Sequence, residues 1–330
     1  MYKLAYVIPT KNRPKCLDEC LDAMSNSFLK YDVAVYIMDG SEDDSSLRVF
    51  EKYKSENIFY SKMPELNGDE RSVFGINVAD SEYVCLSADA HIPSPENTEY
   101  VMHLLDKGYD LLEFSPRDYK HIGLKEYINI VEMFADCAWD STMAGTVFVK
   151  KSSYGTMDYA ELLHKYIYDG FIHIIYYYDF FKKDSFKGIY CPKVLYTVSK
   201  YKGASSWYSK ESFLEIWDKE WVGSISRLSS KFDQYKKQVI LDHGVYGLGL
   251  AYVCSWLKYK SDGLLDEKIF EKYENEIKQI TTVNIKYVRW ICRIPDVFRP
   301  LCGMIQFIFF SIAEAVPVKW RKIIKRLIQK

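Results

Sequence analysis

Three short polar stretches carry the side chains of this sequence that could do chemistry. They are residues 10–13 (TKNR), 39–44 (DGSEDD) and 87–91 (SADAH), and each comes directly after an apolar run. The carboxylates of Asp39 and Asp89 can accept hydrogen bonds or hold a divalent cation, whereas Arg13 can neutralise a phosphate. These residue types therefore predict a site for an anionic ligand, provided that the fold brings the three stretches together.

The elements around these stretches alternate in a way that would do so. Residues 4–8, 33–38, 57–60 and 83–86 are apolar runs of strand length, and residues 16–28, 45–53 and 73–79 have helical spacing. This order predicts an α/β fold with a mostly parallel sheet and right-handed crossovers. Ligands of such sheets bind beyond the carboxyl ends of the strands, where the three stretches lie. Residues 144–149 read as a further strand, and residues 185–206 read as one more strand and the exit from the catalytic domain.

Composition and missing motifs exclude several classes. A chain of 330 residues that is 48% hydrophobic can bury one large domain and an appendage, and its net charge of −1 gives no general attraction for nucleic acid. No GxGxxG or GxxxxGK[ST] motif occurs, so neither a dinucleotide fingerprint nor a P-loop is present. The eight cysteines form no CxxC pair, which favours a reducing compartment, and the first apolar run is too short for a signal peptide.

Three segments together resemble the opening half of a family 2 glycosyltransferase of the GT-A fold. They are AYVIPTKNRPKCLDECLDAM, VAVYIMDGSEDDSS and GINVADSEYVCLSADAHIP, in this order. The resemblance implies transfer of a sugar from a nucleotide diphosphate donor to an acceptor hydroxyl, with inversion. The donor-binding candidates are Pro9, Thr10, Asn12, Arg13, Asp39, Ser41, Arg71 and Asp89.

The roles of these candidates differ, and each has a structural alternative. Asp39 and Ser41 would hold the base and ribose, although Asp-Gly-Ser also makes turns without a ligand. Thr10 and Asn12 would lie beside the nucleotide, although both types are common helix N-caps. Arg13 and Arg71 would border the diphosphate or sugar, although charges at helix starts are often only solvated.

The resemblance implies that Asp89 stands in the family's Asp-x-Asp position, where a carboxylate would hold Mn²⁺ or Mg²⁺ against the leaving diphosphate. Ala88 and Ala90 stand where the family commonly has further acids. Three arrangements stay open, in this order of preference. Asp89 is the only protein carboxylate on the metal, His91 adds an imidazole that favours Mn²⁺, or Arg and Lys neutralise the phosphates without a metal.

An inverting transferase also needs a base that takes the proton of the acceptor hydroxyl. The acidic pair that the family places downstream of the metal motif does not occur in this sequence. The catalytic candidates are instead Asp169, Asp158 and His173, with Glu161 nearby, and a structural role is the alternative for each. The aromatic residues around them, at 166–181, are better explained by core packing than by sugar contact.

The end of the chain differs from the rest in charge. Residues 283–330 carry a net charge of +8, which leaves −9 for the remainder. Residues 300–318 are a marginal membrane span because Glu314 and Pro317 interrupt them. Residues 319–330 (KWRKIIKRLIQK) fit an amphipathic helix that lies on an anionic lipid surface. The alternative is a tail that packs on protein or mediates oligomers.

We therefore predict three parts: a GT-A catalytic domain at 1–206, a helical extension at 207–282, and a membrane-associating tail at 283–330. The predicted protein is a cytoplasmic glycosyltransferase at the inner face of the membrane, which extends a lipid-linked saccharide for a surface polysaccharide. Its partners would be a nucleotide-sugar, a saccharide acceptor and the anionic membrane, with no nucleic acid; a homo-oligomer is compatible with the tail. The alternatives are a non-catalytic nucleotide-sugar or saccharide-binding protein and a nucleotidyltransferase.

Overall fold

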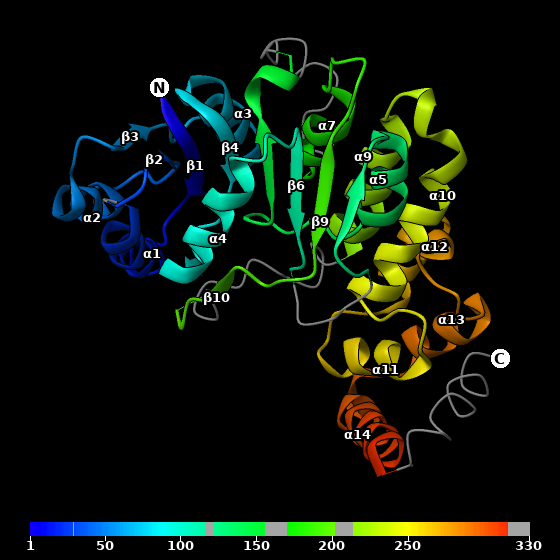
Figure 1. Cartoon of the computed structure of the whole chain (residues 1–330). Coiled ribbons are helices and arrows are strands. Elements are labelled where there is room, and N and C mark those ends of the chain that lie inside the picture. Colours follow the sequence, from blue (N-terminus) through cyan, green and yellow to red (C-terminus); the bar gives the residue numbers. More distant parts are fainter. Residues whose placement is uncertain (29, 117–121, 156–169, 202–213, 316–330) are drawn as a thin grey trace. The chain divides into compact units, whose positions relative to one another are not determined.

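The computed structural model describes residues 1–28, 30–116, 122–155, 170–201 and 214–315 (Figure 1). Its internal contacts divide the chain into two compact units. The first unit comprises Met1–Ser206 and Leu228–Phe232, and the second comprises Trp207–Arg227 and Asp233–Lys330. Each unit is described here by itself.

The first unit is built on a mixed sheet that has eight strands among the described residues. Their order across the sheet is β3-β2-β1-β4-β8-β6-β9-β7. β1 to β4 are all parallel to their neighbours within that group, whereas β8 runs antiparallel to β4 and β6, and β7 runs antiparallel to β9. The strands are β1 (Tyr2–Thr10), β2 (Val33–Asp39), β3 (Ile58–Lys62), β4 (Ser81–Leu86), β6 (Leu111–Phe114), β7 (Lys125–Tyr127), β8 (Val147–Lys150) and β9 (Gly188–Cys191).

Helices flank this sheet, and a short two-stranded sheet of β5 (His91–Pro93) and β10 (Tyr196–Val198) lies beside it (Figure 1). The helices are α1 (Pro14–Phe28), α2 (Ser45–Tyr53), α3 (Gly68–Val78), α4 (Pro95–Leu105), α5 (Ile130–Cys137) and α7 (Ile172–Asp179), with 3₁₀ turns at η1 (Lys151–Ser153) and η4 (Ser230–Phe232). Local signals set their starts: Asn67 and Glu70 form a reciprocal capping box at α3, and Ser94 caps α4 ahead of Pro95.

The core of the first unit confirms the predicted alternation. Leu4 and Ile8 of β1, Val35 of β2, and Leu17 and Leu21 of α1 are all fully or almost fully buried in one cluster. Burial on both faces of β1 and β2 is the reason that these strands read as continuous apolar runs. Aromatic residues of α7, among them Tyr176 to Tyr178, are also buried, as the packing interpretation predicted.

Residues 185–206 were expected to form one strand, and this was wrong. The segment forms β9 in the large sheet and β10 in the small one, so it leaves the first sheet at Cys191 and pairs with β5 in a second. Pro192 directly follows β9. Because proline has no backbone N–H to donate, it ends the ladder at this point.

The described residues of the second unit are mostly helical, as was predicted for the extension at 207–282. Its helices are α9 (Trp221–Arg227), α10 (Asp233–Asp242), α11 (Val253–Ser261), α12 (Glu267–Ile280), α13 (Ile285–Arg293) and α14 (Arg299–Ala315), with π-helical turns η3 (Glu215–Glu220) and η5 (His243–Gly247) and a 3₁₀ turn η6 (Asp296–Phe298). Gly249 has a φ of 70° just after η5. Among the described residues, no helix has the length and apolar character that crossing a membrane requires.

Candidate functional site

Two of the three predicted stretches meet at the carboxylate of Asp89. The Thr10 hydroxyl donates to Asp89 Oδ2 over 2.7 Å, and Arg13 Nη1 lies 3.0 Å from Asp89 Oδ1. This is possible because β1 and β4 are parallel neighbours, so the residues that follow them emerge at the same edge. Asp89 is only 1% exposed, which makes this a buried, charge-assisted cluster.

The third stretch joins the first through a serine. The backbone N–H of Asn12 donates to Ser41 Oγ over 2.8 Å, and the Ser41 hydroxyl donates to Asp39 Oδ1 over 2.6 Å. Asn12 has a φ of 56°, the only positive φ of a non-glycine residue in the part of the chain that the structure describes. Asparagine tolerates this left-handed conformation better than most residues do. The bend at Asn12 therefore turns the first loop onto the second.

Asp39 is fully buried, and hydrogen bonds engage both of its carboxylate oxygens. Besides Ser41, the hydroxyl of Tyr60 on β3 donates to Asp39 Oδ2 over 2.7 Å. Burial and then this carboxylate raise the pKa of Tyr60, which keeps the phenol protonated as a donor. Tyr60 was missed at the sequence level, although its place at the end of the third strand pointed to the same edge. Asp39 thus shapes the second loop. Its contact with the nucleobase of the donor stays a prediction.

Arg71 lies at the same edge, in the first turns of α3. Its residue is 5% exposed, and a Cβ on Gly40 would lie 2.1 Å from Arg71 Nη1. Only glycine at position 40 therefore allows the guanidinium to lie against this loop. Arg71 also donates to the carbonyl of Leu66, and burial lowers the pKa of Arg71 while Asp39 and Glu70 oppose this shift. The Nε–H groups of Arg13 and Arg71 have no acceptor among the described residues.

Charge balance in the cluster depends on Arg13. Burial raises the pKa of Asp89, whereas the positive charge of Arg13 and the hydrogen bond from Thr10 lower it. A buried carboxylate is costly without such a partner. Any ligand that draws Arg13 away must therefore be accompanied by another positive charge on Asp89.

The chemistry of Asp89 fits one kind of divalent cation. Within the described ranges, no group of three His, Cys, Asp or Glu side chains could hold a metal ion. A Mg²⁺ or Mn²⁺ ion that takes most of its ligands from substrate phosphates and water needs only one or two carboxylates. Oδ1 of Asp89 already has a cationic partner in Arg13. Asp89 thus fits a substrate-borne cation, which would replace Arg13 at that oxygen.

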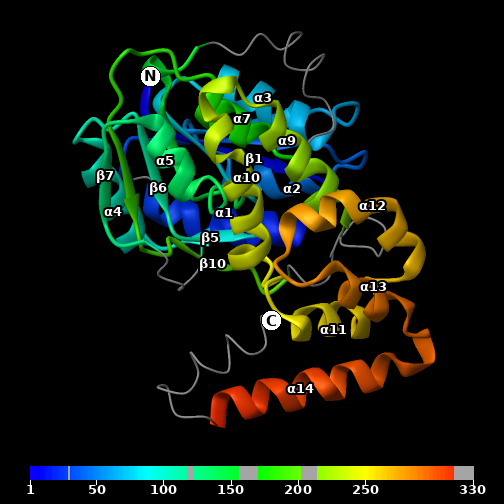
Figure 2. The ribbon, with the colours of Figure 1, turned by 90° about the vertical axis from the view of Figure 1, so that its right-hand side faces the viewer.

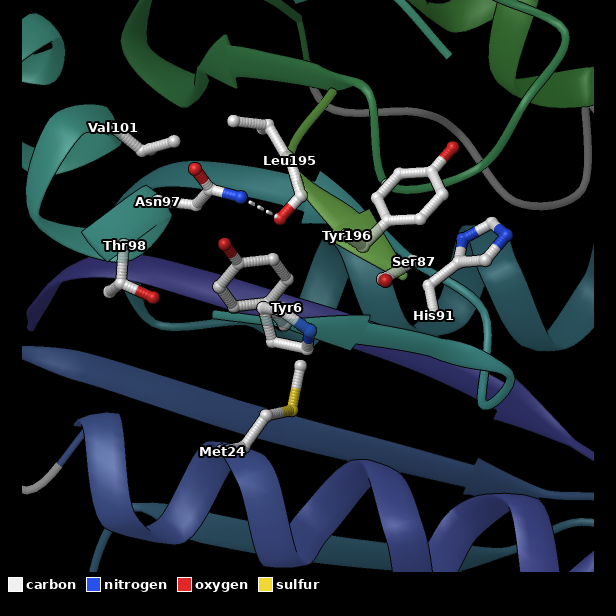
Figure 3. A pocket seen from close by; sticks show the side chains of 11 residues that line it. Tyr6, Met24, Ser87, His91, Asn97, Thr98, Val101, Leu195 and Tyr196 are labelled. Carbon is white, nitrogen blue, oxygen red and sulfur yellow. Dashed lines mark hydrogen bonds between the residues drawn. The ribbon is translucent and has the colours of Figure 1, made fainter. Parts of the chain in front are cut away.

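His91 lies in a separate hollow that Asp89 does not line (Figure 3). Its ring stacks on Tyr196, with centroids 4.0 Å apart, and Asn97 nearby donates to the carbonyl of Leu195 over 2.6 Å. The cavity volume is about 10 Å³, space for at most one water molecule. The hollow is therefore too small to bind a sugar, and its side chains pack against one another. The role of His91 as a metal ligand stays a prediction.

Of the predicted bases, the structure describes only His173. Asp158 and Asp169 lie outside the described residues. His173 is 7% exposed on α7, which packs against α3, and its Nε2 has no hydrogen-bond partner among the described residues. Burial lowers the pKa of His173 to about 4, so its imidazole is neutral near pH 7. The residue after Asp169, Gly170, donates its backbone N–H to Asp69 in the first turn of α3, over 3.0 Å.

One family model matches the first part of the chain. Residues 6–141 match the model described as Glycosyl transferase family 2. This range includes every donor-binding candidate that the sequence analysis named. No curated protein matches the chain.

Solved structures share the fold. TarS 1-349 from S. aureus, in complex with UDP-GlcNAc, is 17% identical, with a TM-score of 0.51 over 88% of this chain and 90% of that one. The structure titled TarS 1-349 alone is 14% identical, with a TM-score of 0.50 over the same shares. A mannosyltransferase from Pyrobaculum calidifontis, in complex with GDP-Man and Mn²⁺, is 13% identical, with a TM-score of 0.48 over 74% of this chain and 70% of that one. The two TarS structures bear out the predicted GT-A architecture.

Proposed function

We propose, from the match of residues 6–141 to the family 2 glycosyltransferase model, that the protein moves a sugar from a nucleotide diphosphate donor to an acceptor hydroxyl, with inversion. The observation that carries the proposal is the meeting of three sequence-distant loops at one sheet edge. Thr10, Arg13 and Asp89 form one part of this meeting, and Asn12 and Ser41 form the other. The nucleotide and diphosphate of the donor would lie along this edge.

The guanidinium groups of Arg13 and Arg71 at this edge would bind the diphosphate of the donor. As the sugar–phosphate bond breaks, negative charge grows on the leaving diphosphate, and fixed positive charges stabilise it. Arg13 and Arg71 each keep an Nε–H without an acceptor among the described residues, so both have donor capacity for phosphate oxygens. Pro9 lies near the end of β1 and pairs in register with Met38 of β2. This pairing fixes where the loop that carries Arg13 begins.

Asp89 would hold a Mn²⁺ or Mg²⁺ ion that arrives with the donor. Such an ion supplies positive charge to the diphosphate in the transition state. The protein's own part is to offer one carboxylate at Oδ1 and to fix Oδ2 through the Thr10 hydroxyl. Arg13, once released from Asp89, would be free to bind a phosphate oxygen.

The acceptor needs a base on the opposite side of the sugar from the diphosphate. We propose Asp169 first, because the backbone of the next residue, Gly170, hydrogen-bonds to the helix that carries Arg71. His173 is the second choice. Its imidazole is neutral and has an unpaired Nε2, but it is 7% exposed and would need an opening to reach the acceptor. Asp158 is the third.

The acceptor is proposed to be a lipid-linked saccharide of a surface polysaccharide, extended at the inner face of the membrane. The excess of positive charge at 283–330 supports this, because an anionic lipid surface would hold the enzyme beside such an acceptor. The TarS structure in complex with UDP-GlcNAc makes UDP-GlcNAc a reasonable first donor to test.

One experiment separates transfer from binding alone. Purified protein is mixed with a panel of UDP- and GDP-sugars, with and without Mn²⁺, and both bound donor and released nucleoside diphosphate are measured. A transferase releases UDP or GDP, by transfer or by slow hydrolysis. A non-catalytic nucleotide-sugar-binding protein gives affinity and no release, and a nucleotidyltransferase instead releases pyrophosphate when given a nucleoside triphosphate and a sugar phosphate.

A further inference from the structure

Large apolar side chains gather on one exposed surface of the second unit. More than half of the exposed large hydrophobic residues in the described chain lie between residues 287 and 308. We call the surface that they form the α13–α14 face; its main members are Trp290, Val297, Phe298, Leu301, Met304 and Phe307. Trp290 is 65% exposed, Val297 77% and Phe307 67%. Contiguous exposure of this kind marks an interaction site more often than scattered single residues do.

The helices of this face have one inner and one outer side. On α13, Val288, Ile291 and Cys292 are buried, whereas Trp290 points away from them. On α14, Cys302 is buried, and Leu301 and Met304 are exposed. α14 packs against α11, and Figure 2 shows it along the edge of the unit with no other described helix on its far side. The outer sides are thus the apolar ones.

A groove joins the two helices. It has a volume of about 610 Å³ and is lined mainly by apolar side chains, among them Leu257, Trp290, Ile294, Phe298 and Leu301. Among the described residues that line it, only Arg293 is charged. A groove of this composition suits hydrocarbon and offers little to a polar ligand.

Two cations fix the corner between α13 and α14. Lys260 is 1% exposed, and its Nζ donates to the carbonyls of Leu265 and Cys292 and to Asp296 Oδ1, at 3.2, 3.3 and 3.0 Å. Arg299 donates from Nε and Nη2 to the carbonyl of Ser261, at 3.2 and 3.1 Å. The apolar side chains are therefore presented on a braced corner, and their exposure does not come from an unpacked helix.

Charge decides between the partners that such a face could bind. Lys286 is exposed beside it, and residues 316–330, which follow α14 directly, contain six Lys or Arg and no Asp or Glu. A second copy of the chain would bring the same positive charge against this one, which is unfavourable. An anionic lipid surface accepts both the apolar side chains and the basic residues, and tryptophan prefers the interface between them.

We infer that the α13–α14 face lies on an anionic membrane, with Trp290, Phe298 and Phe307 inserted at the level of the headgroups. This deepens the membrane association proposed above and rests on it. Within the predicted tail at 283–330, it assigns part of the membrane contact to folded residues between 287 and 308, in addition to the basic residues at 319–330. The catalytic chemistry of the first unit does not depend on it.

The test measures binding of the full-length protein to vesicles of phosphatidylcholine with phosphatidylserine. Trp290→Glu and Phe307→Glu, alone and combined, should each weaken the partition coefficient, the double variant by at least about tenfold. The matched control is Ile128→Glu, which alters an apolar residue of the first unit that is 87% exposed, and it should bind like wild type. Release of UDP from a soluble donor should be the same in all four variants.

Wild-type binding by the double variant, or no binding by the wild type, would overturn the inference. So would a change from dimer to monomer in sedimentation without a change in vesicle binding, because this would make the face a contact between copies. A wild type that binds vesicles through this face but releases no UDP or GDP from any donor would contradict the proposed transfer and leave the membrane contact standing.

Discussion

At the scale of single residues, the Arg13–Asp89 pair is the feature on which the proposed donor binding depends. The two side chains come from loops 76 positions apart and meet over 3.0 Å in a nearly buried setting. A pair of this kind is expensive to break from one side, because the remaining charge is left without a partner. Each member therefore gives a distinct prediction.

Arg13→Ala should weaken UDP binding about 10- to 100-fold, the range expected when a charge-assisted hydrogen bond to a phosphate is lost. Arg13→Lys should restore part of the affinity, because lysine keeps the charge without the forked donors. Titration calorimetry with UDP measures both. Arg48→Ala, an exposed arginine on α2, is the control and should bind UDP normally. Equal affinities for Arg13→Ala and wild type would remove Arg13 from the diphosphate site.

Asp89→Ala should abolish sugar transfer and any gain in donor affinity from Mn²⁺, because Asp89 is the carboxylate proposed to hold the cation. Steady-state turnover and UDP affinity with Mn²⁺ or with EDTA measure the two effects. Glu42→Gln, on the exposed part of the second loop, should change neither. Full turnover of Asp89→Ala would take this residue out of the mechanism.

His173 predicts a loss of stability in acid. Its pKa is about 4 in the folded protein against an ordinary value of 6.5, so its contribution is present above pH 6.5 and is lost as the pH falls toward 4. From pH 7 to pH 5 the loss is about 2 kcal/mol. Urea unfolding at the two pH values should show a smaller loss for His173→Gln than for wild type. His103→Gln, at an exposed position, should behave like wild type; identical pH dependence in both variants would contradict the assignment.

At the scale of elements, close packing of α3 places Arg71 at the site. Gly75 of α3 faces β1 and β2, and a Cβ there would lie 2.3 Å from Val7 Cγ1 and 3.0 Å from Met38 Cγ. The glycine lets the helix approach the two strands whose ends form the site. Gly75 therefore links a packing detail to the proposed donor binding.

Gly75→Ala should destabilise the protein by about 1–3 kcal/mol, the usual cost of overpacking. Gly68→Ala is the matched control on the same helix, because a Cβ there would meet nothing within 4 Å. Its stability should stay within about 0.5 kcal/mol of wild type. Urea denaturation gives both values. A neutral Gly75→Ala would mean that α3 can shift away from the sheet without cost.

The sequence predicted these elements well where burial is two-sided. β1, β2, β4, α1 and α2 lie where the apolar patterns placed them, and the polar ends of the first two strands led directly to Thr10 and Asp39. The short strands β6 and β7 were missed because three or four residues carry too little periodicity. The split of 185–206 was missed because apolar residues lie on both sides of Pro192, so the pattern does not show where the first strand ends.

Contacts within the site were less predictable than its location. The sequence predicted that Asp89 and Thr10 would be near each other, but the Arg13 partner depends on the bend at Asn12, which no periodicity reveals. Tyr60 was likewise missed. A tyrosine near a strand end is most simply explained by packing, and the sequence does not show that its hydroxyl donates to Asp39. Which residue meets which is decided by register, and register is a tertiary property.

At the scale of the whole chain, charge is distributed unevenly. The net charge of −1 combines +8 at residues 283–330 with −9 elsewhere. An anionic surface should therefore repel residues 1–282 and attract residues 283–330. Membrane binding through the tail should therefore be sensitive to ionic strength.

Substituting Lys319, Lys322 and Lys325 by Glu should weaken binding to phosphatidylserine-containing vesicles by at least about tenfold, since each basic residue contributes roughly 1 kcal/mol near such a surface. Vesicle sedimentation measures it. The same change at the exposed lysines Lys231, Lys237 and Lys268 is the control and should have a much smaller effect. Equal losses in both triple variants would point to net charge alone and against a localised contact.

The left-handed backbone of Asn12 also limits how this chain can vary. A saturation library at position 12, screened only for a folded product, should return chiefly glycine, aspartate and asparagine, because a β-branched side chain is strained at that φ. If the same library is screened for UDP binding, the glycine variant should bind UDP more weakly than the asparagine variant, because its more flexible loop must be ordered on binding. The difference between the residues allowed at position 12 for folding and those allowed for UDP binding would thus measure how much affinity the pre-bent loop contributes.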